Sequence, residues 1–163
     1  MPKRIRTFIA VEIDRLVRKQ LEQLQEILAP SAQEFRWVEP ETIHLTLNFL
    51  GDVDERDLYA VCKTVQEIVA DRDQFEMIVA GVGAFPNTNR PRVIWAGVTH
   101  GADELTDIHA ALDVALGEQR HPRENRPFTA HFTVEGFSLD RLARIDRGDI
   151  DRRFEEYRRM TAF

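Results

Sequence analysis

Residues 43–47 read Ile-His-Leu-Thr-Leu, and residues 130–134 repeat the pattern as Ala-His-Phe-Thr-Val. In a β-strand successive side chains point to opposite faces, so each histidine shares one face with the threonine two residues later. The apolar residues between them share the other face, which suits a hydrophobic core. The two copies, here called motif 1 (residues 43–47) and motif 2 (residues 130–134), lie about half the chain apart. They indicate an old duplication that produced two lobes facing each other across a cleft.

Strand and helix patterns alternate on either side of the motifs. Strand-like segments cover residues 5–12, 35–38, 42–50, 75–85, 93–98 and 128–137. Helical periodicity covers residues 14–28, 54–70, 102–116 and 139–160. Several neighbouring strands are joined by short loops, which favours antiparallel pairing. We therefore predict an α+β fold, with bilobal, duplicated antiparallel sheets, flanking helices and a central cleft, in a single two-lobed domain over residues 1–163.

A few residues within these segments carry more specific expectations. Asp14 is the expected N-cap of the first helix, whose apolar face begins with Leu16. Gly51 should end the strand over residues 42–50, and Gly81 and Gly83 should mark a bulge or bend in the strand over residues 75–85. Cys62 lies on the apolar stripe of the second helix, so we expect a buried small side chain there rather than a nucleophile.

Charge and composition exclude several classes of protein. The chain has 163 residues, a formal net charge of −6 and one cysteine. A broad basic face for coating long nucleic acids is therefore not expected, although a local pocket can still attract one phosphate. No apolar run approaches the roughly 20 residues that span a bilayer. We expect a cytoplasmic monomer with no membrane contact.

The residue types of the motifs point to phosphoester chemistry. Opening a cyclic phosphodiester needs a base that activates water and an acid that protonates the leaving oxygen. Histidine suits both roles because its ordinary pKa is about 6.5. Threonine hydroxyls can donate hydrogen bonds to the phosphate oxygens as their charge grows. The five histidines lack a compact metal-ligand spacing, so we expect neither a metal nor another cofactor.

The stretch over residues 35–52, Phe-Arg-Trp-Val-Glu-Pro-Glu-Thr-Ile-His-Leu-Thr-Leu-Asn-Phe-Leu-Gly-Asp, resembles the first signature of the RNA 2′,3′-cyclic phosphodiesterases. These are also called 2′-5′ RNA ligases and belong to the two-histidine phosphoesterase superfamily. Residues 6–11, 83–86, 90–95 and 126–128 resemble further segments of the family. The resemblance implies hydrolysis of an RNA terminal 2′,3′-cyclic phosphate to a 2′-phosphomonoester, with reversible 2′-5′ RNA ligation as a further activity.

The resemblance also implies roles for the motif residues. His44 would donate a proton to the departing 3′ oxygen, and His131 would accept a proton from the attacking water. Thr46 and Thr133 would hold the phosphate. From the residues alone, either histidine could be the acid.

Three departures from the family pattern bear on these roles. Asn48 stands where the family often carries Lys or Arg, and it is expected to bind substrate by hydrogen bonds alone. Glu135 stands where the family often carries Arg, and it shares the face of Thr133 unless a bulge turns it away. The chain ends at Phe163 with a charged helical segment where the family continues into a strand pair. It is either a short variant or lacks the family's C-terminal strands.

Loop arginines and aromatic residues complete the candidate site. Arg92 and Arg126 could contact RNA phosphates, or they could be ordinary solvated arginines. Phe85 and Trp95 could stack on a base, although packing is the more common role of such residues. The substrates expected are RNA ends or nucleoside cyclic phosphates. Two alternatives remain: a phosphodiesterase for another small cyclic phosphate, and a non-catalytic module that binds RNA ends.

Overall fold

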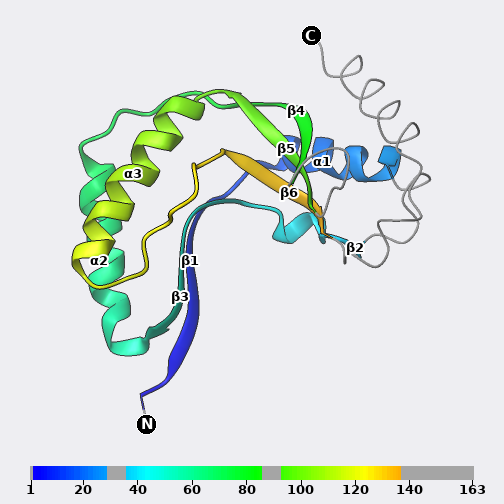
Figure 1. The fold of residues 1–163 in the computed structure, drawn as a ribbon. Coiled ribbons are helices and arrows are strands. Elements are labelled where there is room, and N and C mark those ends of the chain that lie inside the picture. The colour runs from blue at the N-terminus through cyan, green and yellow to red at the C-terminus, as the bar shows by residue number, and fades with distance from the viewer. Residues whose placement is uncertain (1, 29–35, 86–92, 137–163) are drawn as a thin grey trace. The chain divides into compact units, whose positions relative to one another are not determined.

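A computed structural model describes residues 2–28, 36–85 and 93–136 of the chain (Figure 1). Its helices and strands in chain order are β1 (Arg4–Val11), α1 (Arg15–Leu28), β2 (Arg36–Trp37), β3 (Leu45–Asp54), α2 (Leu58–Ala70), β4 (Ile78–Phe85), β5 (Val93–His100), α3 (Ala102–Glu118) and β6 (His131–Gly136). Two short 3-10 turns, η2 (Pro40–Thr42) and η3 (Glu55–Asp57), precede β3 and α2. The helix predicted over residues 139–160 lies outside the described residues.

The predicted α+β class is confirmed, and the chain divides into two compact units. Unit 1 comprises residues 1–11, 46–77 and 100–130, and unit 2 comprises residues 12–45, 78–99 and 131–163. Each unit contains one small antiparallel sheet: β1 and β3 in unit 1, and β2, β6, β5 and β4, in that order, in unit 2. The cleft that we expected between two lobes stays a prediction.

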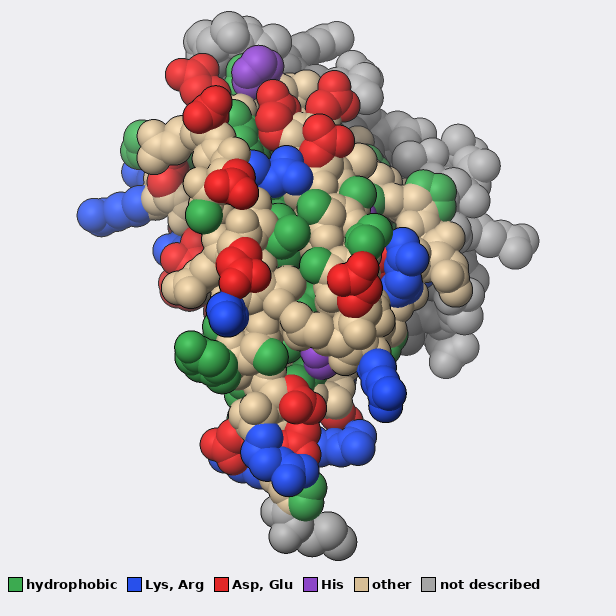
Figure 2. All heavy atoms as spheres, turned by 90° about the vertical axis from the view of Figure 1, so that its left-hand side faces the viewer, with side chains coloured by type: hydrophobic (Ala, Val, Ile, Leu, Met, Phe, Trp, Pro, Cys, Tyr) green, Lys and Arg blue, Asp and Glu red, His purple; other side chains and the backbone are tan. Residues whose placement is uncertain are grey.

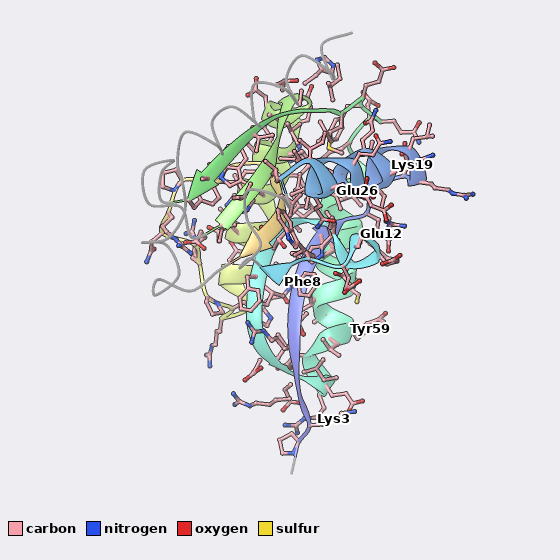
Figure 3. All side chains as sticks on the ribbon, turned by 90° about the vertical axis from the view of Figure 1, so that its right-hand side faces the viewer. Lys3, Phe8, Glu12, Lys19, Glu26 and Tyr59 are labelled. Carbon is pink, nitrogen blue, oxygen red and sulfur yellow. The ribbon has the colours of Figure 1, made fainter. Side chains whose placement is uncertain are left out.

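Unit 1 packs helices α2 and α3 against each other beside the strand pair (Figure 1). Its buried apolar side chains come mainly from β3, α2 and α3: Leu47, Leu50, Val53, Val61, Leu105, Ile108, Leu112 and Leu116. Gln119 donates a hydrogen bond to Thr64, which ties the two helices together. On the outside, Phe8 of β1 and Tyr59 of α2 are 45% and 80% exposed (Figure 3).

Two expectations for unit 1 are wrong. Cys62 is exposed, because only Val61 and Thr64 on α2 are fully buried and the apolar stripe is broader than the packed face. The strand of motif 1 starts at Leu45 and continues past Gly51 to Asp54. Gly51 adopts a φ of +70°, which glycine reaches without a Cβ clash, so it marks an irregularity within the strand instead of its end.

Unit 2 packs α1 beside its four-stranded sheet. Asp14 caps the helix as predicted, because its Oδ1 accepts a hydrogen bond from the Val17 amide at 2.9 Å. The buried face consists of Leu21, Leu24, Gln25 and Leu28. Leu16 is 74% exposed, contrary to the prediction, because only the later turns of the helix are buried.

A β-bulge interrupts the pairing of the two central strands, β5 and β6. Trp95 pairs with Thr133, but the residue before it on β5, Ile94, pairs with Glu135. Val134 is therefore the extra residue of the bulge. Its carbonyl accepts hydrogen bonds from the Val38 amide at 3.1 Å and from Gln25 Nε2 at 3.0 Å. The same Gln25 nitrogen donates to the Val38 carbonyl at 2.7 Å, so one buried side chain closes the end of the β2–β6 ladder.

Two glycines of β4 have different structural roles. Gly81 has a φ of +80° and open space around it, which fits the bend predicted at this position. Gly83 lies directly under the Trp95 indole, and a Cβ placed there would come within 2.3 Å of Trp95 Cζ2. Gly83 is therefore required for the ring to lie this close to β4.

We predict that Gly83→Ala lowers the free energy of unfolding by about 1–3 kcal/mol, because the new methyl displaces a packed indole. Its tryptophan emission should shift as well. Gly81→Asn is the matched control on the same strand, since asparagine tolerates a positive φ. It should cost less and leave the emission unchanged. Equal costs and identical spectra for the two variants, measured by urea unfolding and fluorescence, would contradict the role assigned to Gly83.

We also predict that Gln25→Leu destabilises the protein by about 1–3 kcal/mol, because two buried carbonyls lose a donor that leucine does not supply. Gln23→Leu makes the same change at an exposed position of the same helix and should be nearly neutral. Urea unfolding of both variants is the measurement. A neutral Gln25→Leu would show that the bulge does not need this side chain.

Candidate active site

Motif 1 shows the alternation predicted from its sequence. Ile43, Leu45 and Leu47 are 2%, 0% and 8% exposed, while His44 and Thr46 between them are partly exposed. The strand itself begins at Leu45, so the histidine lies just before it instead of within it. The apolar side chains anchor the segment in the core and leave the two polar side chains accessible.

Motif 2 has the same pattern of burial. Ala130, Phe132 and Val134 are 8%, 0% and 0% exposed, and His131 and Thr133 are partly exposed. His131 is the first residue of β6, the strand paired on both sides within its sheet. Both copies therefore present a histidine at, or one residue before, the start of a strand and a threonine within the strand two residues later.

The orientation of the His44 ring is constrained by its own backbone neighbourhood. Its Nδ1 lies 2.7 Å from the carbonyl oxygen of Thr42, the last residue of η2. A carbonyl can only accept a hydrogen bond, so Nδ1 carries the proton of this contact. Proton exchange with a substrate would then take place at Nε2.

The His131 ring lies in an aromatic setting made by β4 and β5. It meets the Phe85 ring edge-on at a centroid distance of 5.0 Å and the Trp95 indole at 6.0 Å. Phe85 and Trp95 are themselves in contact at 5.2 Å. Gly97 pairs with His131 and leaves space for the indole because it has no side chain. A Cβ at this position would lie 3.1 Å from Trp95 Cζ3. Phe85 and Trp95 thus pack against each other and against His131, and this packing positions the His131 ring.

The bulge in β6 changes the expectation for Glu135. With a regular strand, residue 135 would share the face of His131 and Thr133. The register instead places it opposite Ile94, one step out of that alternation. The backbone therefore follows the bulged alternative that we considered from the sequence.

Asn48 makes a contact that the sequence did not suggest. It is 6% exposed, and its Nδ2 donates to the main-chain carbonyl of His109 on α3 at 3.4 Å. Its Oδ1 is buried and has no hydrogen-bond partner among the described residues. Asn48 thus connects β3 to α3, and its predicted contact with substrate stays a prediction.

The candidate arginines are only partly described. Arg126 is largely exposed, and its Nε donates to Glu124 Oε1 at 3.2 Å. Hydrogen bonds from the Arg126 amide and then from its side chain lower the pKa of the Glu124 carboxyl. Arg92 lies outside the described residues. On the face that carries α2 and α3, acidic and basic side chains are interspersed (Figure 2).

His109 of α3 is a buried histidine that lies outside both motifs and that the motif pattern does not single out. It is 9% exposed, its Nδ1 lies 2.7 Å from the Leu47 carbonyl oxygen, and its ring stacks on Phe128 at 4.4 Å. A signal was present: it adjoins the apolar stripe of Leu105, Ile108 and Leu112 at helical spacing.

The described part of the chain has neither a metal-binding cluster nor a membrane-spanning helix. It contains no group of three or more His, Cys, Asp or Glu side chains placed to hold a metal ion. None of its helices has the length and apolarity that crossing a membrane requires.

Comparison with known proteins identifies the family. The family model described as LigT like Phosphoesterase matches residues 11–95, a region that includes His44 and Thr46. A curated relative from Aquifex aeolicus, named RNA 2′,3′-cyclic phosphodiesterase, is 36% identical over 126 residues, which cover 76% of this chain and 63% of that protein. A relative of the same name from Archaeoglobus fulgidus is 35% identical over 80% of this chain and 71% of its own length.

Solved structures agree on the fold. The crystal structure of TT0787 of Thermus thermophilus superposes with a TM-score of 0.74 at 28% identity, over 82% of this chain and 74% of its own. The crystal structure of E. coli LigT complexed with 3′-AMP has a TM-score of 0.70 at 23% identity, over 83% and 76% of the two chains, and supports the fold alone. Together with the matched family model and the identities to the curated relatives, this confirms the resemblance read from the motifs: the chain belongs to the LigT-like phosphoesterase family.

Proposed function

We propose that this protein hydrolyses the 2′,3′-cyclic phosphate at the end of an RNA to a 2′-phosphomonoester. The observation that carries the proposal is the repeated alternation of the two motifs, in which a His-Thr pair is held accessible above buried apolar residues. The names of the Aquifex and Archaeoglobus relatives support the same substrate class. The chain spans 63% of the length of the Aquifex protein. The activity named for that relative is therefore a proposal for this chain.

The proposed reaction is a single displacement at phosphorus with two proton transfers. His131 accepts a proton from water as the water oxygen bonds to phosphorus. His44 donates the proton on Nε2 to the 3′ oxygen as the bond from phosphorus to that oxygen breaks. The products are a 2′-phosphate and a free 3′ hydroxyl, and the two histidines have exchanged protonation states. Thr46 and Thr133 donate hydrogen bonds to the non-bridging oxygens, whose negative charge increases along the reaction.

Further properties follow from this proposal. All proton transfers are made by side chains of the chain, so the reaction is proposed to need no metal or other cofactor. Ligation would use the same displacement with the 5′ hydroxyl of a second RNA in place of water: the 5′ oxygen bonds to phosphorus, its proton passes to His131, the 3′ oxygen leaves with the proton from His44, and a 2′-5′ bond results. Because each step is reversible, the same groups would also cleave that bond. We propose that the protein acts as a cytoplasmic monomer, and its one cysteine, Cys62, is compatible with a reducing compartment.

The test is to incubate the protein with a nucleoside 2′,3′-cyclic phosphate and excess chelator and to identify the product by ³¹P NMR. A 2′-phosphate is expected. A 3′-phosphate would contradict the assignment of the leaving group, and dependence on added metal would contradict the proposed chemistry. Binding without turnover would favour the alternative of a module that binds RNA ends.

We predict that His44→Ala and His131→Ala each lower kcat by about 10²–10⁴-fold, because each removes one of the two proton-transfer groups. His100→Ala changes an exposed histidine at the end of β5 and should keep wild-type turnover. Circular dichroism should show that all three variants fold. A loss of less than tenfold in either motif variant would exclude the paired mechanism.

We also predict that Thr46→Val and Thr133→Val each lower kcat/KM by about 10- to 100-fold, because each loses one hydrogen bond to a charged phosphate while keeping its shape. Thr106→Val provides the control, since Thr106 is exposed on α3 and bonds only its own helix. Steady-state kinetics measures the effect. If the motif variants behaved like the control, the threonines would have no part in phosphate binding.

A further inference from the structure

His109 and β3 are joined by two hydrogen bonds that run in opposite directions. The His109 Nδ1 bonds the Leu47 carbonyl at 2.7 Å, and the His109 carbonyl accepts from Asn48 Nδ2 at 3.4 Å. Each of the two hydrogen bonds joins a side chain to a main-chain carbonyl. Two adjacent residues of β3 are therefore bound to one residue of α3. Leu47 and Asn48 follow Thr46 directly in the chain. The position of Thr46 is thereby coupled to α3.

The other side of His109 contacts the segment that leads into motif 2. Its imidazole stacks on the Phe128 ring at 4.4 Å with an interplanar angle of 11°. Phe128 stands two residues before Ala130, the first residue of motif 2. One buried ring thus contacts the chain just after the threonine of motif 1 and just before motif 2.

A carboxylate one turn later along α3 secures the same segment. Asp113 accepts hydrogen bonds from the Glu124 amide at 3.1 Å and from Arg123 Nε at 3.0 Å. Burial raises the pKa of Asp113, but these two hydrogen bonds together with nearby positive charge, chiefly that of Arg123, leave the pKa below its ordinary value. Arg123 and Glu124 begin the stretch that ends at Phe128. The segment is therefore held to α3 at two successive turns.

Burying a histidine only to fill space in the core is unfavourable in free energy. A buried polar group costs free energy unless it is hydrogen-bonded, and an apolar residue would fill the same space without that cost. His109 combines a directed donor toward Leu47 with a flat face toward Phe128, and neither phenylalanine nor asparagine supplies both.

We propose that His109 is a positioning residue that sets the places of Thr46 and of the segment entering motif 2 from a single site on α3. The inference rests on the proposed function for its kinetic consequence, because small displacements of groups that bind the reacting phosphate reduce the rate strongly. His109 lies outside both motifs and acts through the residues that it holds, without contact to substrate.

Two substitutions separate the contacts of His109. His109→Phe keeps a ring to stack on Phe128 but loses the bond to Leu47, whereas His109→Asn keeps a donor near the Nδ1 position but loses the stack. We expect His109→Phe to lower kcat about tenfold or more, on the scale of a displaced catalytic group. His109→Asn should recover part of that loss. Leu116→Val, a core change further along α3, serves as the control for a general loss of stability and should keep wild-type kcat.

A second measurement does not depend on turnover. In ¹H–¹⁵N spectra, His109→Phe should shift the amide resonances of Thr46 and Ala130, while Leu116→Val should leave both in place. If the wild-type protein turns over no cyclic phosphate, the proposed function fails, yet these shifts still decide the role of His109. Unshifted Thr46 and Ala130 amides in a folded His109→Phe variant, or a kcat equal to that of Leu116→Val, would overturn the proposal.

Discussion

The constraint on which the rest of this structure depends is the burial of one face of each motif. Phe132, Val134 and Leu45 are fully buried, and each such side chain contributes about 1.5–3 kcal/mol relative to exposure. Because side chains alternate along a strand, anchoring these residues places the neighbouring histidine and threonine on the opposite face. The buried apolar residues of the motifs hold the polar ones in place. The same alternating pattern therefore serves both the packing of the core and the proposed phosphate chemistry.

Around that constraint, each unit adds a different support. In unit 2, the glycines at positions 83 and 97 give room to Trp95, and its ring with that of Phe85 sets the place of His131. The bulge at Val134 is stabilised by Gln25 from α1. In unit 1, His109 bonds the backbone of β3 and stacks on Phe128. Residues that do no chemistry thus account for most of the order near the candidate site.

Much of the fold was predictable because its signals are local. The cap at Asp14 and the alternation in both motifs depend on near neighbours in the chain, and both are confirmed. The errors arise where burial depends on distant partners. Leu16 and Cys62 lie on apolar stripes, but the packed face of each helix is narrower than its stripe. Gly51 resembles a strand end, yet its positive φ is accommodated inside β3.

The sequence by itself determined the family, the α+β class and the four motif residues proposed for chemistry, because a period of two along a strand requires no knowledge of the partner. Tertiary structure decided what surrounds them: the bulge that moves residue 135 out of the alternation, the aromatic rings against His131, and the contacts of Asn48 and His109 with each other. These depend on strand register and on pairs of residues far apart in the chain, 62 positions for Leu47 and His109 and 109 for Gln25 and Val134. Such pairs form only when the whole core packs, so no local pattern records them.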